Sequence, residues 1–156
     1  MDKTFTAYCG LCCRDCIPSN EEFFASVKRL RQTLAELQFS EYARLKSEKN
    51  PFFSGYPVLP ELLREIEALQ CPAPCREGGG KPECETRSCA KERKHEGCWE
   101  CAGRSQCVLL EPLRRIHPNL DYHLELIERF GPDAWFERRK AHYRWQRETA
   151  APEKGE

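Results

Sequence analysis

The sequence predicts a mainly α-helical protein: a small helical domain with a cysteine-rich, loop-dominated metal-binding segment and little or no β-sheet. Three observations lead to this fold class. Apolar residues recur at three- and four-residue steps in several segments, as on one face of a helix. Only three valines and four isoleucines occur in the chain, and β-branched residues favour strands. Seven of the eleven cysteines fall within residues 71–107, where few apolar residues are present.

Three helices are expected before the cysteine-rich segment. The first begins after Asn20. The second restarts at Ser40 and ends before Asn50-Pro51, because a residue that precedes proline avoids the helical conformation. The third covers 60–70 and leads directly to Cys71. Their apolar stripes are formed by Phe23, Val27, Leu30, Leu34 and Leu37 in the first helix and by Leu62, Leu63, Ile66 and Leu69 in the third.

After Cys107, a short apolar turn or helix precedes two longer helices. The first of these carries Leu124, Ile127 and Phe130 on its inner face and ends at Gly131. Pro132 and Asp133 open a last helix that runs to residue 147. Within it, aromatic and basic residues alternate: Trp135, Arg138, Arg139, Lys140, Tyr143, Arg144, Trp145 and Arg147.

The length of 156 residues suits one domain with a modest core. We expect a single cysteine-rich domain over residues 1–149. Its parts are an N-terminal cysteine cluster (1–19), helices (20–70), the metal-binding segment (71–107) and C-terminal helices (108–149), followed by a disordered tail (150–156).

Charge and the chain start indicate a cytoplasmic protein. The 25 Lys and Arg residues balance the 25 Asp and Glu residues, so net charge does not favour a polyanion or a membrane surface as partner. No apolar run could span a bilayer, and the start lacks the basic and apolar regions of a secretory signal. In a reducing compartment, eleven cysteines favour metal ligation over disulfides.

The cysteine spacing predicts metal sites. Cys98 and Cys101 are separated by two residues, as in zinc knuckles, and the pairs Cys84/Cys89 and Cys71/Cys75 are close enough to reach one centre from a turn. The predicted ligands are Cys9, Cys13, Cys16, Cys71, Cys75, Cys84, Cys89, Cys98, Cys101 and Cys107. Because residues 71–107 have almost no apolar side chains, we expect metal to hold them; structural zinc supplies about 10–16 kcal/mol.

Several alternatives stay open at this stage. The same thiolates suit an iron–sulfur cluster for electron transfer or redox sensing. His95 is a candidate further ligand, although a histidine in a charged run is more often solvated, and Cys12 is expected to pack as a small apolar group. The basic and aromatic closing helix suggests nucleic-acid binding, with an outer charged face as the plainer interpretation. No catalytic motif is present, so a binding or regulatory module with a protein partner is expected rather than an enzyme.

Two motifs carry a family resemblance. Cys9-Gly10-Leu11, Cys13 and Cys16 match an opening CGLxCxxC, and the cysteines from Cys71 to Cys107 follow CxGC, then C-x4-CA, then CxxC and one further Cys. In these motifs the chain resembles the domain of unknown function family 3795, small cysteine-rich proteins of bacteria and archaea. It departs from the pattern at Cys71, where three residues rather than two precede the next Cys, and at Ser105-Gln106, where an aromatic residue and Pro are usual. The resemblance implies a metal-binding fold and no particular activity.

Overall fold

The computed structural model describes residues 2–143, 145 and 146, and helices dominate them. These residues contain six α-helices and several short 3-10 helices, and the only β pairing among them is an isolated bridge between Thr6 and Cys12. The prediction of a mainly α-helical fold is therefore confirmed. No helix within the described residues has the length and apolar character needed to cross a bilayer. The predicted tail at 150–156 lies outside the described residues.

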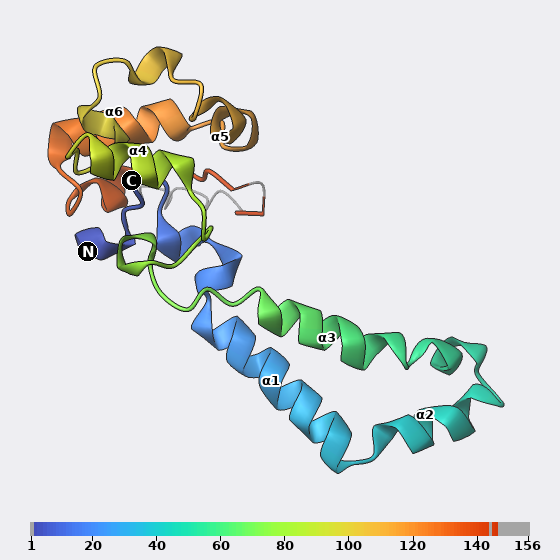
Figure 1. Cartoon of the computed structure of the whole chain (residues 1–156). Helices are drawn as coiled ribbons and strands as arrows, with labels where there is room; N and C mark the ends of the chain where they lie inside the picture. The colour runs from blue at the N-terminus through green and yellow to red at the C-terminus, as the bar shows by residue number, and fades with distance from the viewer. Residues whose placement is uncertain (1, 144, 147–156) are drawn as a thin grey trace, which may run out of the picture. The chain divides into compact units, whose positions relative to one another are not determined.

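The chain divides into two compact units (Figure 1). One consists of residues 17–71. The other combines residues 1–16 with the chain from residue 72 onward, so the N-terminal cysteine cluster and most of the cysteine-rich segment belong to the same unit. That residues 1–149 form a single domain stays a prediction.

The unit of residues 17–71 is a helical hairpin. Its elements are α1 (Glu21–Glu36), α2 (Phe39–Ser47), the 3-10 turn η4 (Pro51–Gly55) and α3 (Val58–Ala68), with α1 and α3 side by side (Figure 1). Helix α1 begins directly after Asn20, as predicted, and the Asn20 side-chain oxygen caps it by accepting the Phe23 amide at 2.9 Å. An Arg31–Glu67 ion pair of 2.8 Å joins α1 to the end of α3.

The predicted apolar stripes of this hairpin are buried only in part. Val27 and Leu63 are buried as expected, whereas Phe23, Leu30, Leu37, Leu62 and Leu69 are exposed. Phe24, which the predicted stripe did not include, is buried in place of Phe23. Two helices that lie side by side bury only the narrow stripe along which they meet, and within this unit no third layer covers the rest. The prediction was wrong in placing Leu30 and Leu62 in a core.

The other unit is built from short elements around one core. Its α-helices are α4 (Glu85–Glu92), α5 (Glu111–Ile116) and α6 (Leu120–Phe130), and its 3-10 turns are η1 (Lys3–Phe5), η2 (Cys13–Asp15), η5 (Cys75–Glu77), η6 (Cys98–Glu100), η7 (Arg104–Gln106) and η8 (Trp135–Arg138). Gly131 ends α6 with φ of +82°, as expected of a glycine at that position.

Helix α6 supplies the centre of that core. Leu120, Leu124 and Ile127 are almost fully buried and pack with Trp99, Trp135 and neighbouring apolar side chains. Within residues 71–107, which were expected to be held by metal alone, Trp99 belongs to the core and α4 is a regular helix. A single large aromatic side chain is enough to attach η6 to α6.

The predicted last helix does not form in the described part of residues 132–147. Only η8 is helical there, and the chain continues irregularly from Arg139. Side chains compete for the backbone donors: the amides of Lys140, His142 and Tyr143 donate to side chains of His123 and Gln146 instead of to helical carbonyls. Arg144 and Arg147, predicted as basic residues of this helix, lie outside the described residues.

Candidate metal centre

Four of the predicted ligands face one small cavity. Cys98 begins η6 and Cys101 caps it, while Cys89 comes from α4 and Cys107 follows η7. All four line a cavity of about 30 Å³, together with His95, Leu109 and Leu110. A space of this size holds one or two water-sized groups. The CxxC knuckle thus lies beside two further thiols, one from each flanking segment.

The thiol of Cys98 lies in an environment that resists charge. Burial raises its pKa to about 12, and the thiols of Cys107, Cys89, Cys101 and Cys84 add to the increase. Burial also raises the pKa of Cys9 to about 12, with further contributions from Cys75, Cys98 and Cys84. Thiolates in these positions are unstable unless a cation compensates their charge.

Arginine side chains organise the loops that carry these cysteines. Arg87 on α4 donates to the backbone carbonyls of Cys75, Gly79, Lys81 and Pro82, at 3.4, 2.7, 2.9 and 2.8 Å. These carbonyls lie outside the α-helices and strands that would supply their hydrogen-bond donors. The N–H groups of a single guanidinium supply the donors instead.

Three further arginines play the same part. Arg76 donates to the carbonyls of Thr6 and Glu96 at 2.8 and 2.9 Å, and its guanidinium lies over the Trp99 ring. Arg104 donates to the Trp99 carbonyl, and Arg114 to the carbonyls of Arg104 and Cys107. Sequence reasoning missed all of these residues. Arg76 and Arg104 lie next to or between cysteines in segments without periodicity, which was the available signal; Arg114, seven residues after Cys107, gave none.

The rest of the N-terminal cluster has other neighbours. Cys12 is fully buried in the core, which confirms its predicted role as a small apolar group, and burial raises its pKa to about 11. Cys16 forms a hydrogen bond with the Tyr143 side chain; burial, followed by the charges of Cys16, Cys9 and Cys13, raises the pKa of that phenol. Cys13 and Cys16 therefore lie near Tyr143 and do not line the four-thiol cavity.

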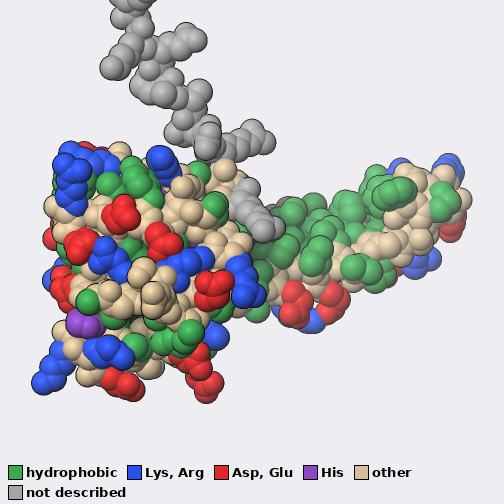
Figure 2. All heavy atoms as spheres, turned by 90° about the horizontal axis from the view of Figure 1, so that it is seen from above, with side chains coloured by type: hydrophobic (Ala, Val, Ile, Leu, Met, Phe, Trp, Pro, Cys, Tyr) green, Lys and Arg blue, Asp and Glu red, His purple; other side chains and the backbone are tan. Residues whose placement is uncertain are grey.

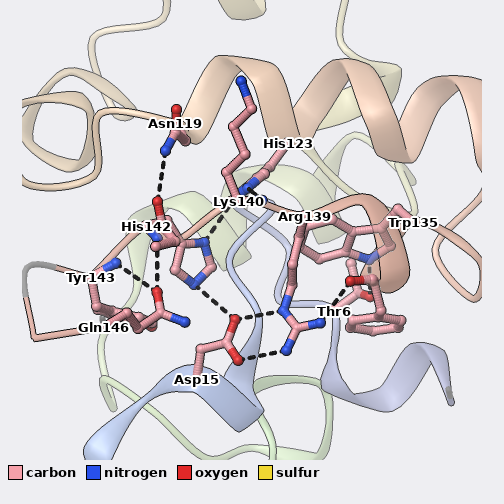
Figure 3. A network of polar contacts seen from close by, with 12 residues as sticks. Thr6, Asp15, Asn119, His123, Trp135, Arg139, Lys140, His142, Tyr143 and Gln146 are labelled. Carbon is pink, nitrogen blue, oxygen red and sulfur yellow. Dashed lines mark hydrogen bonds and ion pairs between the residues drawn. The ribbon is translucent and has the colours of Figure 1, made fainter. Parts of the chain in front are cut away.

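Asp15, between these cysteines, is the centre of a buried polar network (Figure 3). Its two oxygens accept from Arg139 Nε and Nη2 at 2.7 and 2.8 Å. Burial acts to raise the pKa of Asp15, but the ion pair with Arg139 outweighs it and keeps the pKa below its ordinary value. This pair joins the N-terminal cluster to the chain that follows η8.

The same network fixes the tautomers of two buried histidines. The Lys140 amide donates to His123 Nε2 at 3.1 Å, so the proton of His123 is on Nδ1, which faces His142 Nδ1 at 2.9 Å. His142 then carries its proton on Nε2, 3.6 Å from an Asp15 oxygen (Figure 3). Burial lowers the pKa of His123 to about 4 and that of His142 to about 3.

The predicted ligands do not all meet. Cys84 and Cys89 were expected to act as a pair, but only Cys89 lines the cavity, and Cys71 belongs to the hairpin unit rather than to the unit that contains Cys75. Among the described residues, no three His, Cys, Asp or Glu side chains are already arranged to hold a metal ion.

The basic and aromatic side chains predicted to bind nucleic acid are largely engaged within the protein. Trp135 is fully buried and donates to Thr6 Oγ1 at 2.8 Å, and Arg139 is paired with Asp15. Arg138 and Lys140 lie over the rings of Phe130 and Tyr122. Of this set, Trp145 is the large aromatic that the described structure leaves half exposed.

The family is settled by comparison with known protein families. The model of the family described as "Protein of unknown function (DUF3795)" matches residues 5–112. The chain belongs to the DUF3795 family. The match covers the N-terminal cluster and every cysteine up to Cys107, which are the motifs that first indicated it. No curated protein and no solved structure matches the chain.

Proposed function

We propose that this DUF3795 protein is a zinc-stabilised binding or regulatory module, in which the thiols of Cys89, Cys98, Cys101 and Cys107 hold one zinc ion. The observation that carries the proposal is the cavity lined by these four thiols. Four thiolates are a common ligand set of structural zinc, and a site with four protein ligands leaves no position for a substrate. The role of such an ion is to fix the loops around it.

The chemistry of the donor set fits a bound cation. Without one, burial and neighbouring thiols keep Cys98 protonated, since its pKa is about 12. A divalent cation stabilises the thiolate forms and so releases protons as it binds. The free energy of binding then adds to the stability of loops that otherwise depend on Trp99 and a few arginines.

The size of the cavity favours a single ion over an iron–sulfur cluster. A four-iron cluster places iron and sulfide atoms inside its four thiolates, whereas zinc places one atom there. The cavity of about 30 Å³ is on the scale of one or two water-sized groups. Zinc needs only side-chain rotation, whereas a cluster needs the loops to move apart.

Metal analysis of protein purified under reducing conditions tests the proposal. We expect zinc bound to the wild type and loss of at least one ion per chain in the variant Cys101→Ser/Cys107→Ser. Cys71→Ser is the matched control, because Cys71 is in the hairpin unit, and it should retain the zinc of the wild type. Protein without metal, or iron with an absorbance near about 400 nm, would contradict zinc binding.

The proposal includes a protein partner for the hairpin unit. Large apolar side chains gather over its surface (Figure 2), among them Phe52, Leu37 and Leu69, which are 92%, 66% and 62% exposed. Soluble proteins seldom leave so many apolar side chains in water unless another surface covers them. The expected partner is a different protein with an apolar helical face.

Charge substitutions on the hairpin test for this partner. Leu37→Asp/Leu69→Asp should abolish recovery of a defined partner in affinity capture, whereas Glu61→Gln, an exposed polar change on α3, should not. Equal recovery with both variants would contradict the proposed surface. Concentration-dependent dimerisation of the purified wild type would instead identify a second copy as the partner.

A further inference from the structure

We propose that the hairpin unit binds one amphipathic α-helix of its protein partner, and that this helix completes a three-helix bundle with α1 and α3. The side chains that contact it, called the hairpin seam, are Phe23, Leu30, Leu37, Leu62 and Leu69. This inference rests on the proposed function, because the partner is the one assigned to the hairpin. It adds the secondary structure of the bound segment and the charge along its flanks, which is basic.

The spacing of apolar residues in α1 and α3 is typical of helices that pack on other helices. From Phe23 to Leu37 they follow one another at steps of four and three residues, and from Leu59 to Leu69 at steps of three and four. Such alternation repeats every seven residues and gives two apolar positions per repeat, as in a coiled coil.

The hairpin buries only one of the two positions in each repeat. Val27 is buried, and Leu34 and Ile66 are half-buried. All members of the hairpin seam are exposed, by 39% to 66%. A further helix laid over the open positions completes the seven-residue pattern, which is why a helix fits this surface better than a strand or a loop.

Helices α1 and α3 run antiparallel (Figure 1). Lys28 Nζ donates to Gln70 Oε1 at 2.8 Å, and Arg31 Nη1 donates to Glu67 Oε2 at 2.8 Å, so the partner number falls as the chain advances along α1. Two antiparallel helices are related by a twofold axis perpendicular to the plane that contains them. Positions rotated in the same sense from the line of contact therefore point to the same face.

Leu30 and Leu62 are equivalent positions in this arrangement. Leu30 directly precedes Arg31, and Leu62 directly precedes the buried Leu63, which lies one turn before Glu67. One residue turns an α-helix by about 100°, so both leucines are rotated by about that angle, in the same sense, from the line of contact. The other members of the hairpin seam lie seven residues from one of these two. The hairpin seam therefore lies on one face of the hairpin.

The hairpin seam is long enough for a bound helix. Phe23 and Leu37 are fourteen residues apart on α1, which corresponds to about 21 Å along the helix axis. A partner helix of about two to three seven-residue repeats covers this length. It would lie between the rows of Leu30 and Leu62, above Val27 and Ile66.

The outer flanks of the hairpin seam are mainly acidic. A residue directly before a seam residue lies about 100° further from the line of contact. The exposed charged residues at these positions are Glu22, Arg29, Glu36 and Glu61. Glu65 is exposed three residues after Leu62, and Glu61 is paired with Arg64. Lysine or arginine on the bound helix would pair with the remaining carboxylates.

These flanks also decide between a foreign helix and a second copy of the hairpin. Two copies joined through this face would place acidic flanks opposite acidic flanks, and like charges across an interface are unfavourable. A helix with a leucine stripe bordered by basic residues avoids that repulsion. The charge pattern therefore favours a basic amphipathic helix of a different protein.

Two designed peptides test the inference on the natively purified full-length protein. Each is an amphipathic helix of about three heptads with a leucine stripe, bordered by lysine in one peptide and by glutamate in the other. In fluorescence anisotropy, the lysine peptide should bind about tenfold more tightly at low salt, and the difference should shrink as salt rises. Equal affinities would overturn the basic flank, and no binding of either peptide would overturn the helix site.

Variants of exposed residues locate the binding site. Glu22→Lys/Glu65→Lys leaves the apolar side chains in place and should reverse the preference toward the glutamate peptide. Leu30→Asp/Leu62→Asp should abolish binding of both peptides, whereas Ile116→Asp, a 49% exposed apolar position on α5, should bind like the wild type. Unchanged binding in Leu30→Asp/Leu62→Asp, with the circular dichroism of the wild type, would overturn the site.

Competition separates this inference from the proposed function. A captured partner that depends on Leu37 and Leu69 but is not displaced by the lysine peptide would overturn the bound helix and leave the partner surface intact. Capture of no partner would contradict the proposed partner, whereas peptide binding that is lost in Leu30→Asp/Leu62→Asp would still support the helix site. Dimerisation of the wild type that is lost in the same variant would overturn the foreign helix.

Discussion

Acid sensitivity of the cysteine-containing unit follows from its two buried histidines. His123 and His142 are almost completely buried and neutral, with pKa values lowered from 6.5 to about 4 and about 3. In the unfolded chain each regains a pKa near 6.5. The unfolded state therefore binds more protons between pH 6.5 and 4, and the free energy of unfolding falls as pH decreases through that window.

The magnitude can be worked from these pKa values. Between pH 7 and pH 5, proton uptake by the unfolded state lowers the free energy of unfolding by about 2 kcal/mol for each histidine, or about 4 kcal/mol for both. Asp15 contributes in the same direction only at lower pH. Its pKa is depressed in the folded state, so its contribution is present above the unfolded value and lost as pH falls through the folded value.

The assay is denaturant unfolding followed by tryptophan fluorescence at pH 7 and pH 5. All three tryptophans, at 99, 135 and 145, lie in the unit with the histidines and none lies in the hairpin, so the signal reports that unit alone. His142→Phe removes one titrating group and should reduce the pH dependence by about half. Arg115→Gln, an exposed position on α5, is the control for substitution as such and for metal release at low pH, which affects both variants equally. An unchanged pH dependence in His142→Phe would refute the reasoning.

Three other outcomes are expected. Arg139→Ala leaves the buried Asp15 carboxylate without its partner and should reduce the free energy of unfolding by about 3 kcal/mol in denaturant titration, whereas a loss below about 1 kcal/mol would show that the pair contributes little. Arg87→Ala removes the donor to four loop carbonyls and should expose residues 79–82 to limited proteolysis, with Ser88→Ala, an exposed position on the same helix, as control. A chelator should change tryptophan emission while the circular dichroism of α1 and α3 persists, and simultaneous loss of both signals would contradict independent units.

The sequence predicted those helices whose ends carry a residue that starts or stops a helix. Asn20 as cap and Gly131 as terminator mark the ends of α1 and α6 because their side-chain or backbone properties act locally. Cys12 was also predictable as a core residue, since an adjacent thiol cannot point at the same centre as Cys13.

The thiol grouping could not be read from spacing. Cys84 and Cys89 are five residues apart, yet only Cys89 lines the cavity, and the backbone hydrogen bond from Cys98 to Tyr8 holds the N-terminal segment beside the knuckle. Such long-range contacts between loops have no periodicity. The prediction of the last helix was wrong for a related reason. The His123 side chain, from α6, and the polar Gln146 side chain accept hydrogen bonds from its backbone amides, and the chain is irregular there.

X-ray absorption at the zinc edge of the natively purified protein tests the central claim most directly. If Cys89, Cys98, Cys101 and Cys107 hold zinc, the spectrum will show sulfur neighbours only, about four per ion at about 2.3 Å. In Cys101→Ser/Cys107→Ser this contribution should fall, while Cys71→Ser should match the wild type. A shell of nitrogen and oxygen at about 2.0–2.2 Å, or no zinc edge in reduced protein, would contradict the thiolate site.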